Sequence, residues 1–182
     1  MPSHESASLW RQIGDHGGKS LTLLTVAHLQ ALTDEAAMAL ALAEAEEAGA
    51  RGDVPVGAVV LAGDRTVLAQ AHNERERRGD PTAHAEILAL SRAAATQGSW
   101  RLAGASVVVT LEPCPMCAGA LVAARVARVV FGAADPKAGA CGSLYNLCCD
   151  PRLNHQVEVR SGLWAPHCGR VLSNFFAQCR TR

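Results

Sequence analysis

The sequence has 182 residues and a mass of 19.0 kDa, which fits one domain or one domain with an appendage. Hydrophobic residues make up 49% and charged residues 19%, which excludes wholesale disorder, and aromatics at 4% leave Ala, Val and Leu to build the core. The formal net charge is zero, yet residues 1–91 carry −6 and residues 92–182 carry +6. This separation indicates either a polyanionic partner for the second half or attraction between the two halves.

The cysteines and the hydropathy pattern indicate where the protein works. An odd number of cysteines, seven, with five of them after residue 140, is typical of a reducing compartment rather than of a disulfide framework. No apolar run reaches the roughly 18 residues that span a bilayer. Leu21–Leu32 is interrupted by His28 and Gln30 and does not have the form of a secretory signal. We therefore expect a cytoplasmic protein with no membrane partner.

The predicted elements begin after residue 32. Residues 1–32 are predicted to be an N-terminal extension, disordered or loosely packed, and residues 33–182 the folded domain. Thr33 is a helix N-cap before a helix over residues 36–48, and Gly49 ends that helix. The patterns predict further helices over residues 83–95, 114–124 and 166–179, and strands over residues 54–61, 66–71, 105–110, 126–132 and 156–161. Their alternation favours an α/β layer structure with a partly parallel central sheet.

The strongest chemical signal combines a His-x-Glu triplet at residues 84–86 with a Pro-Cys-Pro-Met-Cys run at residues 113–117. Cys114 and Cys117 are three residues apart, so they project within about 60° of each other on a helix. The helix dipole favours their thiolate forms, which bind metals. His84 adds an imidazole, and three protein ligands with an open fourth position are typical of catalytic zinc. A redox-active cysteine pair is the alternative, and it leaves His84 and Glu86 without a role.

Glu86 lies two residues beyond His84 and is interpreted as a proton carrier rather than as a metal ligand. Zinc lowers the pKa of a bound water towards about 7. Two thiolates weaken this effect because they cancel the charge of the metal. A carboxylate that takes the proton compensates for the weaker acid. The alternative for Glu86 is a solvated glutamate in the first turn of a helix.

These motifs resemble the zinc-dependent cytidine and nucleobase deaminase superfamily. Longer stretches between about residues 33 and 180 are similar to the bacterial tRNA-specific adenosine deaminases: Val54–Ala58, Asp80–Ile87, Thr110–Cys114, Phe131–Ala133, Asp135, Lys137, Gly142–Leu144, Asn154-His155 and Asn174–Phe176. Residues 1–32 have no counterpart. Five cysteines do not match family metal positions and are expected to be small buried hydrophobes: Cys141, Cys148, Cys149, Cys168 and Cys179. The alternative is a second zinc site built from Cys148, Cys149 and Cys168, against which the adjacency of two of these cysteines argues.

The resemblance implies a three-layer cytidine-deaminase-like fold, with a central mixed five-stranded sheet flanked by helices. It implies a homodimer and one zinc ion per chain, held by His84, Cys114 and Cys117, with Glu86 as the catalytic acid and base. The implied reaction is the hydrolytic deamination of adenosine to inosine at the wobble position of a tRNA anticodon loop. Four substrate-binding residues are also implied: Asn73 for the target base, Asp135 and Lys137 for neighbouring nucleotides, and Phe176 for the RNA channel.

The residues by themselves leave alternatives open for these positions. Asn73 is equally typical of a turn, Asp135 and Lys137 are more typical of a charged loop than of an RNA contact, and one residue of the Phe175-Phe176 pair is expected in the core. The alternating arginines and glutamates of residues 74–78 predict a solvated loop.

Two other functions also fit the zinc motif. One is a free-base or nucleotide deaminase of the cytosine or guanine type with the same fold. The other is a non-catalytic, zinc-stabilised RNA-binding subunit, against which Glu86 argues, because a structural site has no use for a proton carrier.

Overall fold

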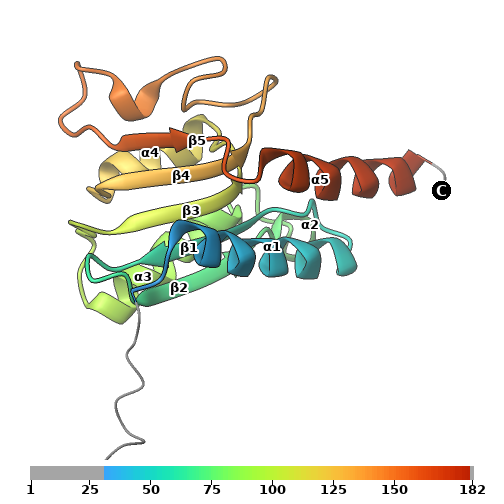
Figure 1. Ribbon diagram of the computed structural model, residues 1–182, viewed down its shortest axis with the longest axis horizontal. Coiled ribbons are helices and arrows are strands. Elements are labelled where there is room, and N and C mark those ends of the chain that lie inside the picture. The colour runs from blue at the N-terminus through green and yellow to red at the C-terminus, as the bar shows by residue number, and fades with distance from the viewer. Residues whose placement is uncertain (1–30, 181–182) are drawn as a thin grey trace, which may run out of the picture. The chain divides into compact units, whose positions relative to one another are not determined.

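Five strands form one mixed sheet in the order β2-β1-β3-β4-β5 (Figure 1). Their bounds are β1 Gly57–Leu61, β2 Val67–His72, β3 Ser106–Leu111, β4 Arg128–Ala133 and β5 Glu158–Ser161. β1 pairs antiparallel with β2 and β3, whereas β3, β4 and β5 are parallel. The mixed five-stranded sheet predicted from the sequence is therefore confirmed.

The computed structural model describes residues 31–180. Its helices are α1 Asp34–Ala50, α2 Arg75–Arg78, α3 Ala85–Gln97, α4 Pro115–Ala123 and α5 Ala165–Arg180, with a 3-10 turn, η1, at Leu147–Cys149. The expected N-terminal extension lies outside the described residues, apart from its last two positions. No helix within residues 31–180 combines the length and hydropathy that crossing a membrane requires.

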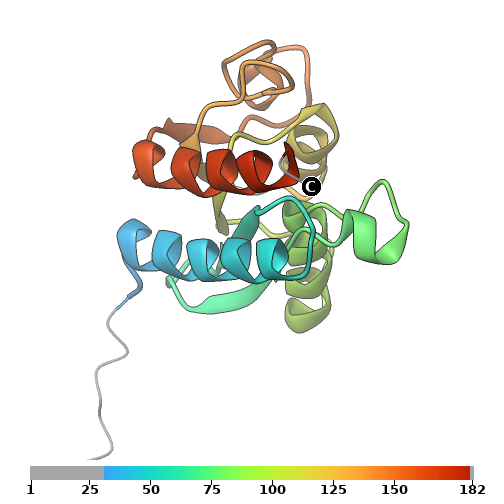
Figure 2. The same ribbon diagram turned by 90° about the vertical axis from the view of Figure 1, so that its right-hand side faces the viewer.

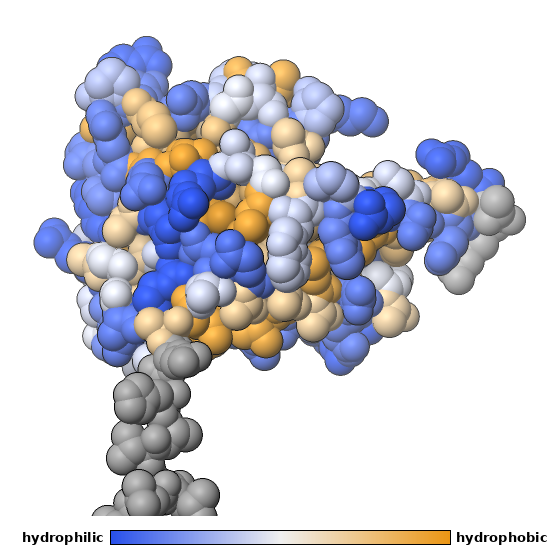
Figure 3. Space-filling view, in the orientation of Figure 1, coloured by the Kyte–Doolittle hydropathy of each residue, from blue (hydrophilic) through white to orange (hydrophobic). Residues whose placement is uncertain are grey.

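Helices cover both faces of the sheet because successive side chains of a strand point to opposite faces. Val59, Leu61, Val108 and Val130 pack with residues of α1 and with Cys168 of α5. Their neighbours along the same strands, such as Val60 and Val107, pack with residues of α3 and α4. Figure 2 shows α1 and α5 side by side on the first face, and Figure 3 shows apolar residues gathered between them. The core is made mainly of Val, Ala and Leu, as the composition predicts.

The first helix begins where the sequence predicts. The Thr33 hydroxyl accepts a hydrogen bond from the Ala36 N–H at 3.2 Å, so Thr33 is the N-cap of α1. The helix then crosses β1 at very short range: a Cβ on Gly57 would lie 2.0 Å from the carbonyl oxygen of Ala41. Only glycine permits this approach, which brings the start of β1 against the middle of α1.

An ion-pair cluster joins the two oppositely charged halves of the sequence. Asp34, at the start of α1, binds Arg128 of β4 at 2.8 Å and Arg160 of β5 at 2.9 Å. It also binds Arg65 of the β1–β2 turn at 2.6 Å. Some of the opposite charges of the two halves therefore pair with each other inside the domain. Attraction between the halves was one of the two interpretations that the sequence left open.

Candidate active site

The candidate site lies at the edge of the sheet where β2, β3 and β4 end and β1 begins. The strand register brings these ends together, since Gly57 pairs with His72, Ala58 with Val109, and Leu111 with Ala133. The helices that follow start at the same edge: His84 is the N-cap of α3, and Cys114 is the N-cap of α4. Segments far apart in the sequence therefore place their polar side chains at one edge.

His84, Cys114 and Cys117 form a cluster with the spacing of a metal site. The His84 Nδ1 atom lies 3.7 Å from the Cys114 Sγ and 3.6 Å from the Cys117 Sγ. All three ligand atoms lie within 4.8 Å of one another. Ligands about 2.0–2.3 Å from a tetrahedral zinc ion lie about 3.5–3.8 Å apart, so the donor types and their spacing both fit zinc. Within residues 31–180, no other group of His, Cys, Asp or Glu has this arrangement.

Hydrogen bonds within the cluster shift the pKa values of its three side chains. A hydrogen bond from the Cys117 thiol lowers the pKa of Cys114 to about 4, and His84 contributes to the same shift. The pKa of Cys117 is raised in turn, because its proton is held between the two sulfurs. The hydrogen bond with Cys114 raises the pKa of His84. One thiolate is therefore stabilised at the N-terminus of α4, where the helix dipole adds to the effect.

Glu86 lies in the first turn of α3, next to this cluster. Its side chain is buried, with 4% of the residue exposed. Burial raises the pKa of Glu86, and the Cys117 side chain interacts with its carboxyl group. A buried carboxyl group beside the His84, Cys114 and Cys117 side chains has the environment of a general acid and base rather than of a solvated surface glutamate.

A cavity of about 660 Å³ opens beside Glu86, and the four residues assigned to the substrate by resemblance all line it: Asn73, Asp135, Lys137 and Phe176. They come from three places, namely the end of β2, the loop after β4, and α5. His84, Glu86 and Cys114 line the same cavity. The size suits a nucleoside-sized ligand, since ligand pockets measure about 300–1,000 Å³.

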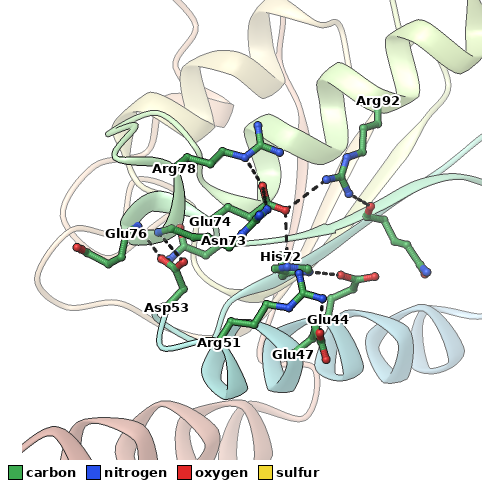
Figure 4. A network of polar contacts seen from close by, with 12 residues as sticks. Glu44, Glu47, Arg51, Asp53, His72, Asn73, Glu74, Glu76, Arg78 and Arg92 are labelled. Carbon is green, nitrogen blue, oxygen red and sulfur yellow. Dashed lines mark hydrogen bonds and ion pairs between the residues drawn. The ribbon is translucent and has the colours of Figure 1, made fainter.

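Asn73 is fixed by a polar network (Figure 4). Its amide Nδ2 donates to the Val54 carbonyl at 3.2 Å and faces the Asp53 carboxylate at 3.5 Å. Both of these partners are acceptors only, so the NH₂ group has to face them. Asp53 also accepts the N–H groups of Glu76 and Arg77 at 2.8 and 3.1 Å, and thereby joins Asn73 to the start of α2.

The segment after Asn73 is exposed at residues 75–78, as the sequence predicts, but it is a helix rather than a loop, and its first acid is buried. Residues 75–78 form the short helix α2, and Glu74 is buried. The Glu74 carboxylate binds Arg77 at 2.7 Å. It also binds Arg92 at 3.5 Å and accepts a hydrogen bond from Arg78 (Figure 4). Burial alone would raise the pKa of Glu74, but the bonds from Arg77 and Arg78 hold it below its ordinary range. The alternating charges thus pair around one buried acid.

The Phe pair also differs from the expectation. Phe176 is 44% exposed at the cavity wall and Phe175 is half-buried near Gly49, so neither is a core residue. Their rings instead meet edge to face, 5.4 Å apart. Of the five other cysteines, Cys141, Cys148 and Cys168 are buried and the remaining two are exposed.

Sequence reasoning assigned no role to the buried acid Glu112. It lines the cavity between β3 and Cys114, and its carboxylate accepts hydrogen bonds from the loop that follows β4. An acidic residue at the end of an apolar strand is a signal that could have identified it. Asp53 was missed as well, because a lone aspartate before a strand is typical of turns.

Comparisons with known proteins agree with this arrangement. A family model described as MafB19-like deaminase matches residues 32–180. The tRNA-specific adenosine deaminase of Bacillus subtilis is 50% identical over 149 residues, which cover 82% of this chain and 92% of that protein. The tRNA-specific adenosine deaminase of Haemophilus influenzae is 45% identical over 147 residues, or 81% of this chain and 85% of that protein.

Among solved structures, this chain is more similar to a tRNA-editing deaminase than to a guanine deaminase. A structure from a study of A-to-I editing by tRNA deaminases at the wobble position has a TM-score of 0.72 and 43% identity, covering 75% of this chain and 98% of that chain. A guanine deaminase from Nitrosomonas europaea has a TM-score of 0.66 and 25% identity, covering 90% of this chain and 100% of that chain. Both measures are higher for the tRNA-editing structure than for the free-base deaminase.

Proposed function

Because this chain belongs to the tRNA-specific adenosine deaminases, we propose that its His84, Cys114 and Cys117 hold one zinc ion at the catalytic centre of that reaction. The chain is an enzyme that deaminates adenosine to inosine at the wobble position of tRNA. One observation supports these residue roles: buried Glu86 lies beside the cluster of three ligand side chains, at the wall of a nucleoside-sized cavity. We take residues 33–182 as the catalytic domain.

The reaction replaces the amino group on C6 of adenine with the oxygen of a water molecule, releasing ammonia. A zinc ion held by the three ligands supplies a Lewis acid that lowers the pKa of a water molecule. Glu86 takes one proton from the attacking water and passes it to N1 of the ring while the hydroxyl adds to C6. It then takes the second proton from this C6 hydroxyl, which becomes the carbonyl, and gives it to the amino group, which leaves as ammonia. Glu86 is buried and lines the cavity, so its carboxyl group is placed to exchange protons with a base bound there.

The cavity wall binds the RNA in this proposal. Asn73 contacts the target base, while Asp135 and Lys137 contact the nucleotides beside it, and Phe176 lines the channel. Lys137 is exposed at the cavity wall, so its ammonium group can reach a phosphate. The target base has to leave its stack to enter the cavity, which requires less free energy in a single-stranded loop than in a duplex.

We further propose that the enzyme is a cytoplasmic homodimer. An apolar groove lies between α3 and α4, lined by residues that include Ile87, Trp100 and Ala123, and Trp100 is 59% exposed. An exposed apolar surface of this kind is typical of a protein–protein interface. The seven cysteines are all free thiols, which suits the reducing cytoplasm.

Product analysis on defined substrates tests the proposed function. The zinc-loaded wild type is incubated with an anticodon stem-loop that carries adenosine at the wobble position, and separately with free guanine and free cytosine. We expect inosine in the stem-loop and no product from either free base. Deamination of a free base with an unchanged stem-loop would establish the alternative function instead.

A further inference from the structure

The loop between β4 and η1 is folded around one buried carboxylate, that of Glu112. Its Oε2 atom accepts the Asp135 N–H at 3.0 Å, and its Oε1 atom accepts the N–H groups of Cys141 and Ser143 at 3.0 and 2.9 Å. The Ser143 hydroxyl also donates to Oε2. Only 3% of Glu112 is exposed. Both ends of the loop therefore converge on a single side chain.

Each Glu112 oxygen accepts two hydrogen bonds, which accounts for the lone pairs of an ionised carboxylate. No acceptor capacity remains for a substrate group or for a proton in transfer. Although Glu112 lines the cavity, its hydrogen-bonding capacity is used entirely by the loop. This distinguishes Glu112 from Glu86, and any effect it has on the reaction has to pass through the loop.

The backbone around Glu112 is fitted to it closely. A Cβ on Gly139 would lie 2.4 Å from the Glu112 carboxylate and 2.6 Å from the Asp135 carbonyl, so the loop passes over the acid without room for a side chain. Two backbone bonds complete the arrangement, from the Gly139 N–H to the Asp135 carbonyl and from the Ala140 N–H to the Pro113 carbonyl, both at 2.8 Å. The loop is therefore attached to the segment that carries Cys114.

The opposite side of this loop forms a wall of the cavity, through Ala134, Asp135, Pro136, Lys137 and Ala138. Asp135 Oδ1 accepts the N–H groups of Lys137 and Ala138, so the position of Lys137 depends on that of Asp135. The Asp135 backbone is in turn held by Glu112. A chain of hydrogen bonds thus runs from Glu112, two residues before a metal ligand, to the residues that face the RNA in the proposed function.

We propose that Glu112 is a positioning residue, which holds the loop of residues 134–143 in the conformation that binds the nucleotides beside the target adenosine. This inference rests on the proposed function. Loss of the carboxylate leaves three backbone N–H groups and one hydroxyl without their acceptor, so the loop rearranges to reach water. RNA binding then weakens, while Glu86 and the metal ligands, which lie on α3 and α4, keep their places.

The test compares Glu112→Gln with Asp34→Asn. Each change neutralises a hydrogen-bonded carboxylate, buried in Glu112 and partly buried in Asp34, but Asp34 binds its arginines at the opposite end of the sheet. We expect Glu112→Gln to raise the KM for the anticodon stem-loop by about tenfold or more, with kcat at saturating RNA within about threefold of wild type. Zinc content should stay at one per chain in both variants, and Asp34→Asn should leave KM unchanged although it lowers the melting temperature.

Ser143→Ala keeps the test decisive if Glu112→Gln fails to fold. It leaves the carboxylate in place and removes one hydrogen bond, so we expect a smaller rise in KM, of about threefold, and faster amide exchange at Asp135. An unchanged KM in every folded variant would overturn the positioning role, and so would a fall in kcat alone. A wild type that forms no inosine in the stem-loop would instead overturn the proposed function.

Discussion

Replacing Asp34 with asparagine tests whether the cluster of three arginines stabilises the fold. Four hydrogen bonds from Arg65, Arg128 and Arg160 reach this carboxylate at 2.6–3.0 Å. Hydrogen bonds to charged groups contribute about 1.5–3 kcal/mol each when buried. Arg160 is mostly exposed, so its contribution is that of a surface pair, about 0–1 kcal/mol. Because Asn keeps one acceptor oxygen, we expect the free energy of unfolding to fall by about 3 kcal/mol.

The assay is urea denaturation of the zinc-loaded proteins, with Glu35→Gln as the matched control. Glu35 is the next acidic residue in the same helical turn and is exposed, so its substitution changes the helix-dipole interaction alone, by about 0.3–1 kcal/mol. A loss below 1 kcal/mol in Asp34→Asn, or one equal to that of the control, would refute the reasoning.

The same variant has a pH signature. Burial alone would raise the pKa of Asp34, but the hydrogen bonds and charges of Arg65 and Arg128 lower it overall. A lowered pKa means that the ionised carboxylate stabilises the fold above the unfolded value of about 3.9, and that this contribution disappears as the pH falls through the folded value. The difference between wild type and Asp34→Asn should therefore be constant from about pH 5 to 8 and shrink below about pH 4.

Three further predictions concern the metal, the RNA and the assembly. Cys114→Ala should abolish metal binding, measured by elemental analysis, and two zinc ions per wild-type chain after dialysis would contradict a single site. Lys137→Ala should weaken stem-loop binding and reduce the slope of log affinity against log salt concentration by about 0.7. Arg152→Ala is the control, because Arg152 is paired with Asp150, and it should leave this slope unchanged. Equal slopes for wild type and Lys137→Ala would show that Lys137 contacts no phosphate. Ala123→Glu should convert the dimer to monomer in sedimentation, and a wild type that is monomeric and fully active would refute the dimer.

The layout of the fold follows from local signals in the sequence. The Thr33 cap predicted the start of the first helix correctly, but Gly49 does not end it: Gly49 lies inside α1, which extends from Asp34 to Ala50 and has Arg51 as its C-cap. The predicted strands agree with the observed ones to within a few residues. The signal is clearest for β1, β3 and β4, which are almost fully buried and are therefore near-continuous apolar runs. The His84, Glu86, Cys114 and Cys117 cluster was found because its members occur as two short motifs, and the structure brings their side chains together.

What the sequence did not indicate depends on contacts between distant segments. Glu74 is one of several alternating charged residues, so the sequence does not indicate that it is buried. Only the fold shows that Arg92 and His72 lie beside its carboxylate. The Phe pair was assigned partly to the core because the chain has few aromatic residues, but α5 places Phe176 at a cavity instead. Glu112 likewise had no visible partner, since its hydrogen-bond donors follow it by about 23 to 31 residues.

The most direct test of the account is the rate of inosine formation in a single turnover, with wild type and Glu86→Gln at equal zinc content. The substrate is an anticodon stem-loop with adenosine at the wobble position, at saturating enzyme. If Glu86 carries the proton, the substitution should lower the rate by about 10²–10⁴-fold or more, while RNA affinity and zinc content stay as in wild type. A rate within tenfold of wild type in the folded, zinc-loaded variant would contradict the assignment of Glu86 as the catalytic acid and base.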